Sequence, residues 1–188
     1  MNTWQFTPAR LPGAWVVDCF YAGDQRGGFV KCFERSLFEA AGIPFALSET
    51  FASTSASGVI RGLHFQTNHP QAKLVSVLSG SVWDVIVDLR IGSPAFGHWE
   101  GFELSAENHR ALYVPRGFAH GFYSREDGTV MLYQCDGRYD KETDGGIRFD
   151  EPALGIQWPE GWEQAVHSER DLSLGSLQEY LASPMRVE

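Results

Sequence analysis

Alternation of apolar and polar residues in short runs is the feature of this sequence that most restricts its fold. In residues 82–89, Asp84 and Asp88 fall on one face of an extended chain, opposite Trp83, Val85, Val87 and Leu89. Turn-forming Gly, Pro, Asn or Asp clusters separate further runs at 16–21, 29–33, 99–104, 111–114, 119–123 and 129–135, and Ser79-Gly80 predicts a hairpin that joins 73–78 to 82–89. Many short strands at this spacing predict an all-β sandwich or barrel.

Two short helices are predicted to interrupt the strands, because two Ser-x-x-Glu capping boxes are present. Ser36 with Glu39 precedes Gly42, and Ser176 with Glu179 lies near the C-terminus. The sequence has no internal repeat and no low-complexity linker, so residues 1–188 are predicted to form a single domain.

Charge and hydropathy exclude several classes of partner. With 24 acidic and 15 basic residues the net charge is −9, whereas proteins that bind nucleic acid in general present a basic face. A bound phosphate would need a local basic pocket. No apolar run approaches the ~20 residues of a membrane span, and the first residues lack a signal peptide's pattern, so we expect a cytoplasmic protein without a membrane partner.

The cysteines predict free thiols. Cys19, Cys32 and Cys135 are odd in number and share no CxxC or CxH spacing, so neither a disulfide framework nor a zinc site is indicated.

Side chains suited to proton transfer and anion binding concentrate in residues 58–139. Arg61 and His64 lie in GVIRGLHFQ (58–66), Lys73 in QAKLV (71–75) and His120 in PRGFAHGF (115–122). Residues three apart on a regular strand point to opposite faces. We therefore predict a β-bulge at Gly62 that brings Arg61 and His64 to the same side.

The Pro-x-Gly-x-x-His segment at 115–120 resembles the second motif of the cupin superfamily, whose fold is a double-stranded β-helix, or jelly roll. A metal-binding cupin normally adds a His-x-His pair and a Glu in its first motif, since a divalent metal needs three or four protein ligands. Gln66 stands where the second histidine of that pair would be, so the metal set is incomplete.

A more extensive resemblance joins these segments to others in order and spacing. Together with DVIVDLR (84–90), SPAFG (93–97), LSAEN (104–108) and PALGIQWP (152–159), they resemble the dTDP-4-dehydrorhamnose 3,5-epimerase family from about Asp24 to Asp171. The resemblance implies a cupin-type jelly roll with short flanking helices. It also implies a homodimer that needs neither metal nor cofactor and that epimerises a nucleotide-linked 4-keto-6-deoxy sugar.

The family pattern assigns four catalytic residues. A ketone at C4 acidifies the protons on C3 and C5, so inversion needs a base, an acid and a cation for the enolate oxygen. By resemblance His64 is the base, Asp171 orients it, Lys73 lies near the enolate oxygen and Tyr133 supplies a proton from the opposite face. Without the resemblance, Asp171 could equally cap the C-terminal helix.

Binding roles also come from the resemblance. Arg61 and His120 match positions beside the sugar and pyrophosphate, Tyr139 a second tyrosine of the site, and Arg26 an arginine that reaches the nucleotide from the partner subunit. We expect an N-terminal arm, residues 1–50, to contribute to the dimer. The predicted substrate-binding set is Arg26, Phe29, Glu49, Arg61, Gln66, His120 and Tyr139.

The sequence departs from the family in its nucleotide-contact segments. Lys31 stands where a glutamate is typical, and ETFAS (49–53) replaces a Gln-x-Asn-x-Ser-like run. The carrier is therefore dTDP by default, with CDP- or GDP-linked sugars as the alternative, and inversion at one or both of C3 and C5 stays open. Two other classes also stay open: a metal-dependent cupin enzyme that uses His64 and His120, and a non-catalytic jelly-roll binding module.

Overall fold

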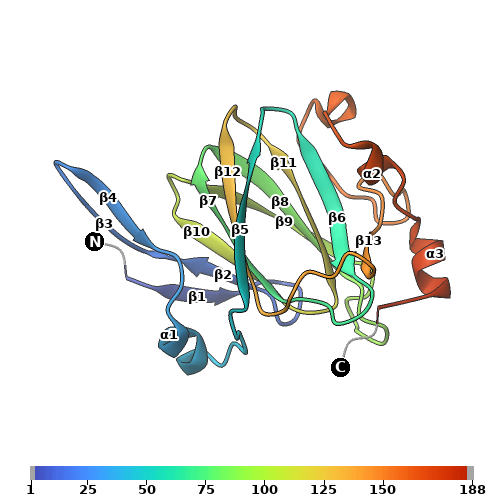
Figure 1. Ribbon diagram of the computed structural model, residues 1–188, viewed down its shortest axis with the longest axis horizontal. Coiled ribbons are helices and arrows are strands. Elements are labelled where there is room, and N and C mark those ends of the chain that lie inside the picture. The colour runs from blue at the N-terminus through green and yellow to red at the C-terminus, as the bar shows by residue number, and fades with distance from the viewer. Residues whose placement is uncertain (1–2, 186–188) are drawn as a thin grey trace.

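Two antiparallel sheets face each other in the computed structural model, which describes residues 3–185 (Figure 1). In spatial order, the six-stranded sheet contains β1 (Gln5–Pro8), β2 (Trp15–Asp18), β10 (Arg110–Val114), β7 (Lys73–Ser79), β12 (Thr129–Cys135) and β5 (Glu49–Ser55). The five-stranded sheet contains β13 (Asp144–Gly146), β6 (Ile60–Gln66), β11 (Phe118–Ser124), β8 (Ser81–Asp88) and β9 (Trp99–Ser105). The fold is the predicted all-β jelly roll.

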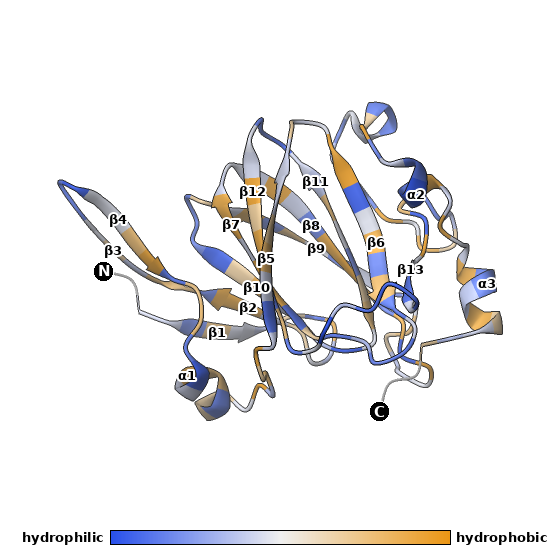
Figure 2. Cartoon of the chain, in the orientation of Figure 1, coloured by the Kyte–Doolittle hydropathy of each residue, from blue (hydrophilic) through white to orange (hydrophobic). Residues whose placement is uncertain are grey.

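Apolar side chains fill three regions. One cluster, which includes Val75, Ile86 and Met131, lies between the sheets, where strand residues meet face to face. A second lies under the segment 147–185, which carries η1 (Trp162–Gln164), α2 (Glu169–Leu172) and α3 (Leu177–Ala182) and covers the outer face of the five-stranded sheet (Figure 2). A third packs α1 (Arg35–Ala40) against the six-stranded sheet through Phe38.

The strand predictions are largely confirmed, with one correction. The predicted hairpin is β7–β8. The run 16–21 is not one strand, because Cys19 donates its N–H to His109 and separates β2 from β3 (Phe20–Asp24). Asp84 and Asp88 alternate with apolar residues as predicted but do not face solvent. Both are 0% exposed, because the second sheet covers one face of β8 and the C-terminal segment covers the other.

The two helix starts differ in outcome. Ser176 and Glu179 form the predicted capping box at α3. The predicted box at Ser36 is wrong, because α1 begins two residues earlier than that box requires and has Glu34 at its N-cap position. The Ser36 hydroxyl instead donates to the Glu34 carboxylate at 3.0 Å.

The β3–β4 hairpin (Phe20–Asp24 and Gly27–Lys31) belongs to neither large sheet and extends away from both (Figure 1). It lies in the predicted N-terminal arm, of which residues 1–2 are outside the described part. Every residue of β4 is exposed, and Phe29 has 58% of its surface open. Within residues 3–185, no helix has the length and apolar character needed to cross a membrane.

Candidate active site

A cavity of about 570 Å³ has walls from both sheets, with β5, β7 and β12 on one side and β6, β11 and β13 on the other. Eight of the predicted site residues line it: Glu49, Arg61, His64, Gln66, Lys73, His120, Tyr133 and Tyr139. Its other lining residues are Phe51, Ser53, Phe65, Gln71, Gly121, Phe122, Asp144 and Arg170. The structure thus brings together residues that are up to 121 positions apart in the chain, from Glu49 to Arg170.

The bulge predicted at Gly62 is present. His120 pairs with His64 but Phe122 pairs with Arg61, so β6 has one residue more than β11 in this interval. Gly62 has φ +132°, and a Cβ there would lie 2.5 Å from the Gly121 Cα, so only glycine fits. The extra residue is why both Arg61 and His64 reach the cavity.

His64 and Asp171 form the predicted pair. The Nε2 atom of His64 lies 2.5 Å from Asp171 Oδ1, and the Ser168 hydroxyl donates to the other carboxylate oxygen at 2.8 Å. Ser168 is the N-cap of α2, so capping places Asp171 in the first turn rather than making it the cap. Burial raises the pKa of Asp171, but hydrogen bonds from His64 and Ser168 outweigh it and hold the pKa below the usual range.

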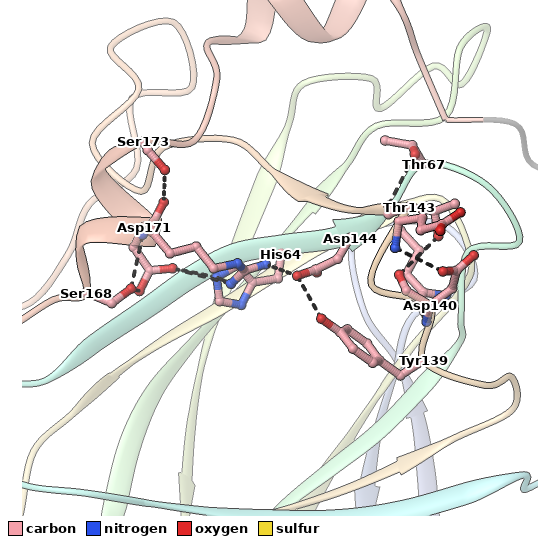
Figure 3. A network of polar contacts seen from close by, with 12 residues as sticks. His64, Thr67, Tyr139, Asp140, Thr143, Asp144, Ser168, Asp171 and Ser173 are labelled. Atoms are coloured by element: carbon pink, nitrogen blue, oxygen red, sulfur yellow. Dashed lines mark hydrogen bonds and ion pairs between the residues drawn. The ribbon is translucent and has the colours of Figure 1, made fainter.

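A chain of polar contacts continues from His64 through Arg170 and Asp144 to Tyr139. Arg170 Nη1 lies 2.8 Å from His64 Nε2, and its Nη2 donates to Asp144 Oδ2 at 2.6 Å. The Tyr139 hydroxyl donates to the same oxygen at 3.2 Å. Figure 3 shows His64 between Asp171 and Asp144, with Tyr139 beyond. Burial is the largest influence on the pKa of His64 and lowers it, which favours the neutral imidazole.

Lys73 supplies a partly buried amino group. It lies at the start of β7 and lines the cavity, and burial lowers its pKa, while Cys135, Asp144 and Asp84 act in the opposite direction. Within residues 3–185 its ammonium group makes no ion pair. An ammonium without a fixed partner is available to an anion that develops in the cavity.

Tyr133 lies on the opposite sheet from His64. Its ring stacks on Phe51 with centroids 4.7 Å apart and meets the edge of His120 at 6.0 Å. Burial raises the pKa of the phenol, so the hydroxyl keeps its proton at neutral pH.

His120, which lines the cavity, and Asp84 form a second histidine–carboxylate pair. Nε2 of His120 lies 2.8 Å from Asp84 Oδ2, and both residues are buried. Burial raises the pKa of Asp84, while His120 and Lys73 lower it. His64 and His120 are cross-strand neighbours, and their Nε2 atoms contact Asp171 and Asp84. Across residues 3–185, however, no group of three or more His, Cys, Asp or Glu side chains is placed to hold a metal ion.

Two further predicted residues that line the cavity, Arg61 and Gln66, are hydrogen-bonded to neighbouring segments of the chain. Arg61 donates to Ser55 Oγ at 3.1 Å and to the Thr54 carbonyl at 3.2 Å. Gln66 accepts from the Asp140 N–H at 2.6 Å and donates to the His69 and Arg138 carbonyls. Gln66 therefore fixes the loop that carries Tyr139, a role that its cavity position alone does not indicate.

Two predicted binding residues lie outside this cavity. Arg26 forms an ion pair with Asp24 at 2.5 Å, and Phe29 is exposed on β4. Both belong to the β3–β4 hairpin, which extends away from the cavity-bearing sheets (Figure 1). The structure does not bring them to the site of their own chain.

Sequence reasoning did not identify Asp84, Asp144 or Arg170 as site residues. Arg170 precedes Asp171 in the segment SERD (168–171), and this neighbour of a predicted catalytic carboxylate was the available signal. Asp144 follows a polar loop that has no motif (Figure 2).

Comparisons with known proteins agree on one family. The family model described as dTDP-4-dehydrorhamnose 3,5-epimerase matches residues 8–179. A protein of that name from Methanothermobacter thermautotrophicus is 39% identical over 180 residues, which cover 95% of this chain and 97% of the relative.

Solved structures give the same result. An epimerase from Legionella pneumophila, described as dTDP-6-deoxy-D-glucose-3,5-epimerase in complex with dTDP-4-keto-L-rhamnose, has a TM-score of 0.91 and 36% identity, covering 99% of this chain and 100% of that one. A 3'-monoepimerase from Streptomyces bikiniensis, in complex with dTDP-quinovose, has a TM-score of 0.86 and 32% identity, covering 93% of this chain and 89% of that one. The chain belongs to the dTDP-4-dehydrorhamnose 3,5-epimerase family.

Proposed function

We propose that this chain is an isomerase that inverts C3, C5 or both in a nucleotide-linked 4-keto-6-deoxy sugar during deoxysugar biosynthesis. The default substrate is dTDP-4-dehydro-6-deoxyglucose, and the product is of the dTDP-4-dehydrorhamnose type. One observation carries the proposal: His64 projects from β6 and Tyr133 from β12, on facing sheets that enclose the cavity. Inversion at carbon requires a base on one face of the sugar and an acid on the other.

The first half-reaction breaks a C–H bond beside the ketone. In the tautomer that donates from Nε2 to Asp171, His64 has a lone pair on Nδ1, which takes the proton from C3 or C5. The C–H electron pair moves into the ring to give an enolate, and the Lys73 ammonium stabilises its oxygen.

The second half-reaction forms a C–H bond on the other face. The Tyr133 hydroxyl gives its proton to the carbon, and the enolate electrons return to regenerate the ketone. The imidazolium then loses its proton to water and the phenolate gains one from water, so each inverted carbon exchanges one substrate proton with solvent.

The proposed assembly is a homodimer, and the proposed partner of the arm is a second copy of this chain. The exposed Phe29 and Arg26 support this, because they lie on a hairpin that neither large sheet covers. The proposed setting is the cytoplasm, and the free thiols of Cys19, Cys32 and Cys135 suit a reducing compartment.

Deuterium incorporation tests the function directly. The protein is incubated in heavy water with dTDP-4-dehydro-6-deoxyglucose, and proton NMR follows loss of the C3 and C5 signals and appearance of inverted product. We expect exchange and inversion without added metal and in the presence of a chelator. Absence of exchange, or exchange that depends on stoichiometric iron, manganese or zinc found by elemental analysis, would overturn the proposal.

A further inference from the structure

The proposed acid, Tyr133, is held between two rings. Phe51 is its direct cross-strand partner, and their rings stack at 4.7 Å with an angle of 11° between planes. His120 meets Tyr133 at 6.0 Å and 76°, as an edge against a face. Such aromatic pairs have preferred geometries, so the two contacts together restrict where the phenol hydroxyl can point.

The two holding rings are anchored differently. His120 is 3% exposed and hydrogen-bonded to the buried Asp84, so its ring is fixed within the five-stranded sheet. Phe51 lies on β5, the edge strand of the six-stranded sheet, which within residues 3–185 pairs only with β12. Its side chain lines the cavity, and 48% of its surface is exposed. Of the two rings that hold Tyr133, Phe51 is therefore the more weakly anchored, and a change at Phe51 would change the position of Tyr133.

The position of the Tyr133 hydroxyl matters because this acid acts after the enolate has formed. Once His64 has removed a proton, the enolate can be reprotonated by the imidazolium on the original face or by Tyr133 on the opposite face. Rotation of Tyr133 about its Cα–Cβ bond moves the hydroxyl away from the carbon, and a misplacement of about 1 Å can cost on the order of a hundredfold in rate.

We infer that Phe51 is a positioning residue for Tyr133, and that its stacked ring determines what fraction of the enolate is reprotonated on the inverted face. This inference rests on the proposed function. The side chain touches the acid and borders the cavity but carries no proton to transfer. Phe51 thus decides between inversion and unproductive exchange without taking part in the proton transfers.

The test compares deuterium incorporation with inversion in the same reaction, so weaker substrate binding cancels from the ratio. For Phe51→Ala and Phe51→Leu we expect inverted product per incorporated deuterium to fall about tenfold or more, while Phe51→Tyr keeps the ratio near that of the wild type. Thr50→Ala is the matched control, because Thr50 lies on the same strand and outside the cavity lining. An unchanged ratio in Phe51→Ala, or an equal loss of exchange and inversion, would overturn the inference.

A double-mutant cycle checks that Phe51 acts through Tyr133. In the Tyr133→Phe background, Phe51→Ala should change the ratio less than twofold, since the group it positions is already gone. If the fold-changes of Phe51→Ala and Tyr133→Phe in this ratio multiply in the double mutant, Phe51 acts independently of Tyr133 and the inference is overturned.

A readout without substrate separates this inference from the proposed function. Loss of Phe51 should open Tyr133 to water, so the raised pKa of the phenol should fall in Phe51→Ala. Alkaline ultraviolet titration measures this, with Tyr133→Phe subtracted to assign the signal. Failure of the wild type to exchange deuterium overturns the proposed function, whereas an unchanged Tyr133 titration overturns the role of Phe51.

Discussion

Nε2 of His64 has two neighbours that require opposite protonation states. Asp171 Oδ1 at 2.5 Å accepts from a protonated nitrogen, while Arg170 Nη1 at 2.8 Å donates to an unprotonated one. A single nitrogen cannot satisfy both at once. Arg170 also opposes the imidazolium by charge, and together with burial it holds the pKa of His64 down, against the upward effect of Asp171. The base is thus kept neutral before substrate arrives.

The first prediction concerns pH. Because the pKa of His64 is lowered, kcat/KM should stay level through neutral pH and fall only below about 6.5, as the imidazole gains a proton. Asp171→Asn removes a group that raises this pKa, so the acid limb should move to lower pH while kcat drops. Kinetics across a pH series measure both effects. An acid limb that moves to higher pH in Asp171→Asn would contradict the assigned His64–Asp171 pair.

The second prediction concerns the base and acid themselves. His64→Ala and Tyr133→Phe should each lower turnover by about two to four orders of magnitude, the usual contribution of a positioned acid or base. Tyr133→Phe should still exchange deuterium, because His64 is intact. Circular dichroism should show that both variants fold.

Tyr123→Phe serves as the control for Tyr133→Phe, because Tyr123 packs under the C-terminal segment and does not line the cavity. Normal inversion by Tyr133→Phe would instead assign the acid to another residue, such as Tyr139.

At the level of elements, local patterns predicted strands well and their environments less well. Alternation in 82–89 identified β8, and the Ser176 box identified α3, because both signals are complete within a few residues. Burial of Asp84 could not be read from that pattern. That burial depends on the facing sheet and the C-terminal segment, and on β11, which brings His120 against the carboxylate from 36 positions away in the chain.

The site shows the same limit. Gly62 predicted the bulge because a local backbone requirement selects glycine. The contact of Asp171 with His64 spans 107 positions, and only the family resemblance predicted it. Asp144 and Arg170 join the site through the placement of a short strand and a four-residue helix, for which the sequence carries no periodic signal.

The third prediction concerns the cysteines of the arm, where Cys19 and Cys32 flank the β3–β4 hairpin. A hydrogen bond from Cys19, supported by Ser76, lowers the pKa of Cys32 to about 6, whereas Cys19 and Cys135 have raised pKa values. Iodoacetamide should therefore label Cys32 first at neutral pH, with a rate that rises through a midpoint near 6. Peptide mass spectrometry identifies the site, and Cys19→Ala should move the midpoint upward. Equal labelling of all three thiols would contradict the prediction.

The fourth prediction concerns the whole molecule. A hairpin with exposed Phe29 and Val30 that pairs with neither sheet needs a covering surface, and the proposed second copy provides one. Sizing with light scattering should give a dimer at micromolar concentration, and Phe29→Asp should weaken it by placing a charge in the interface. Leu181→Asp on α3, also half-exposed, is the control. A monomeric wild type would remove the basis for an arm that reaches a partner.

The last prediction concerns recognition of the nucleotide. In the proposed dimer, residues of both subunits would contribute to this recognition. Lys31, at the end of β4, forms a 2.7 Å ion pair with Glu34, while Glu49 accepts from Gln71 inside the cavity. Lys31 and Glu49 therefore do not pair with each other within one chain. Beside Glu49, Phe51 presents a ring, which can stack on any base.

We therefore expect calorimetry to give a preference for dTDP over CDP and GDP of less than a hundredfold, about 2.7 kcal/mol. Phe51→Asn replaces the stacking surface with a group that forms directional hydrogen bonds, and it should widen the difference between bases. A wild-type preference of a hundredfold or more would show that Lys31 and Phe51 leave thymine recognition intact. Discrimination would then come from backbone groups or from the partner's arm.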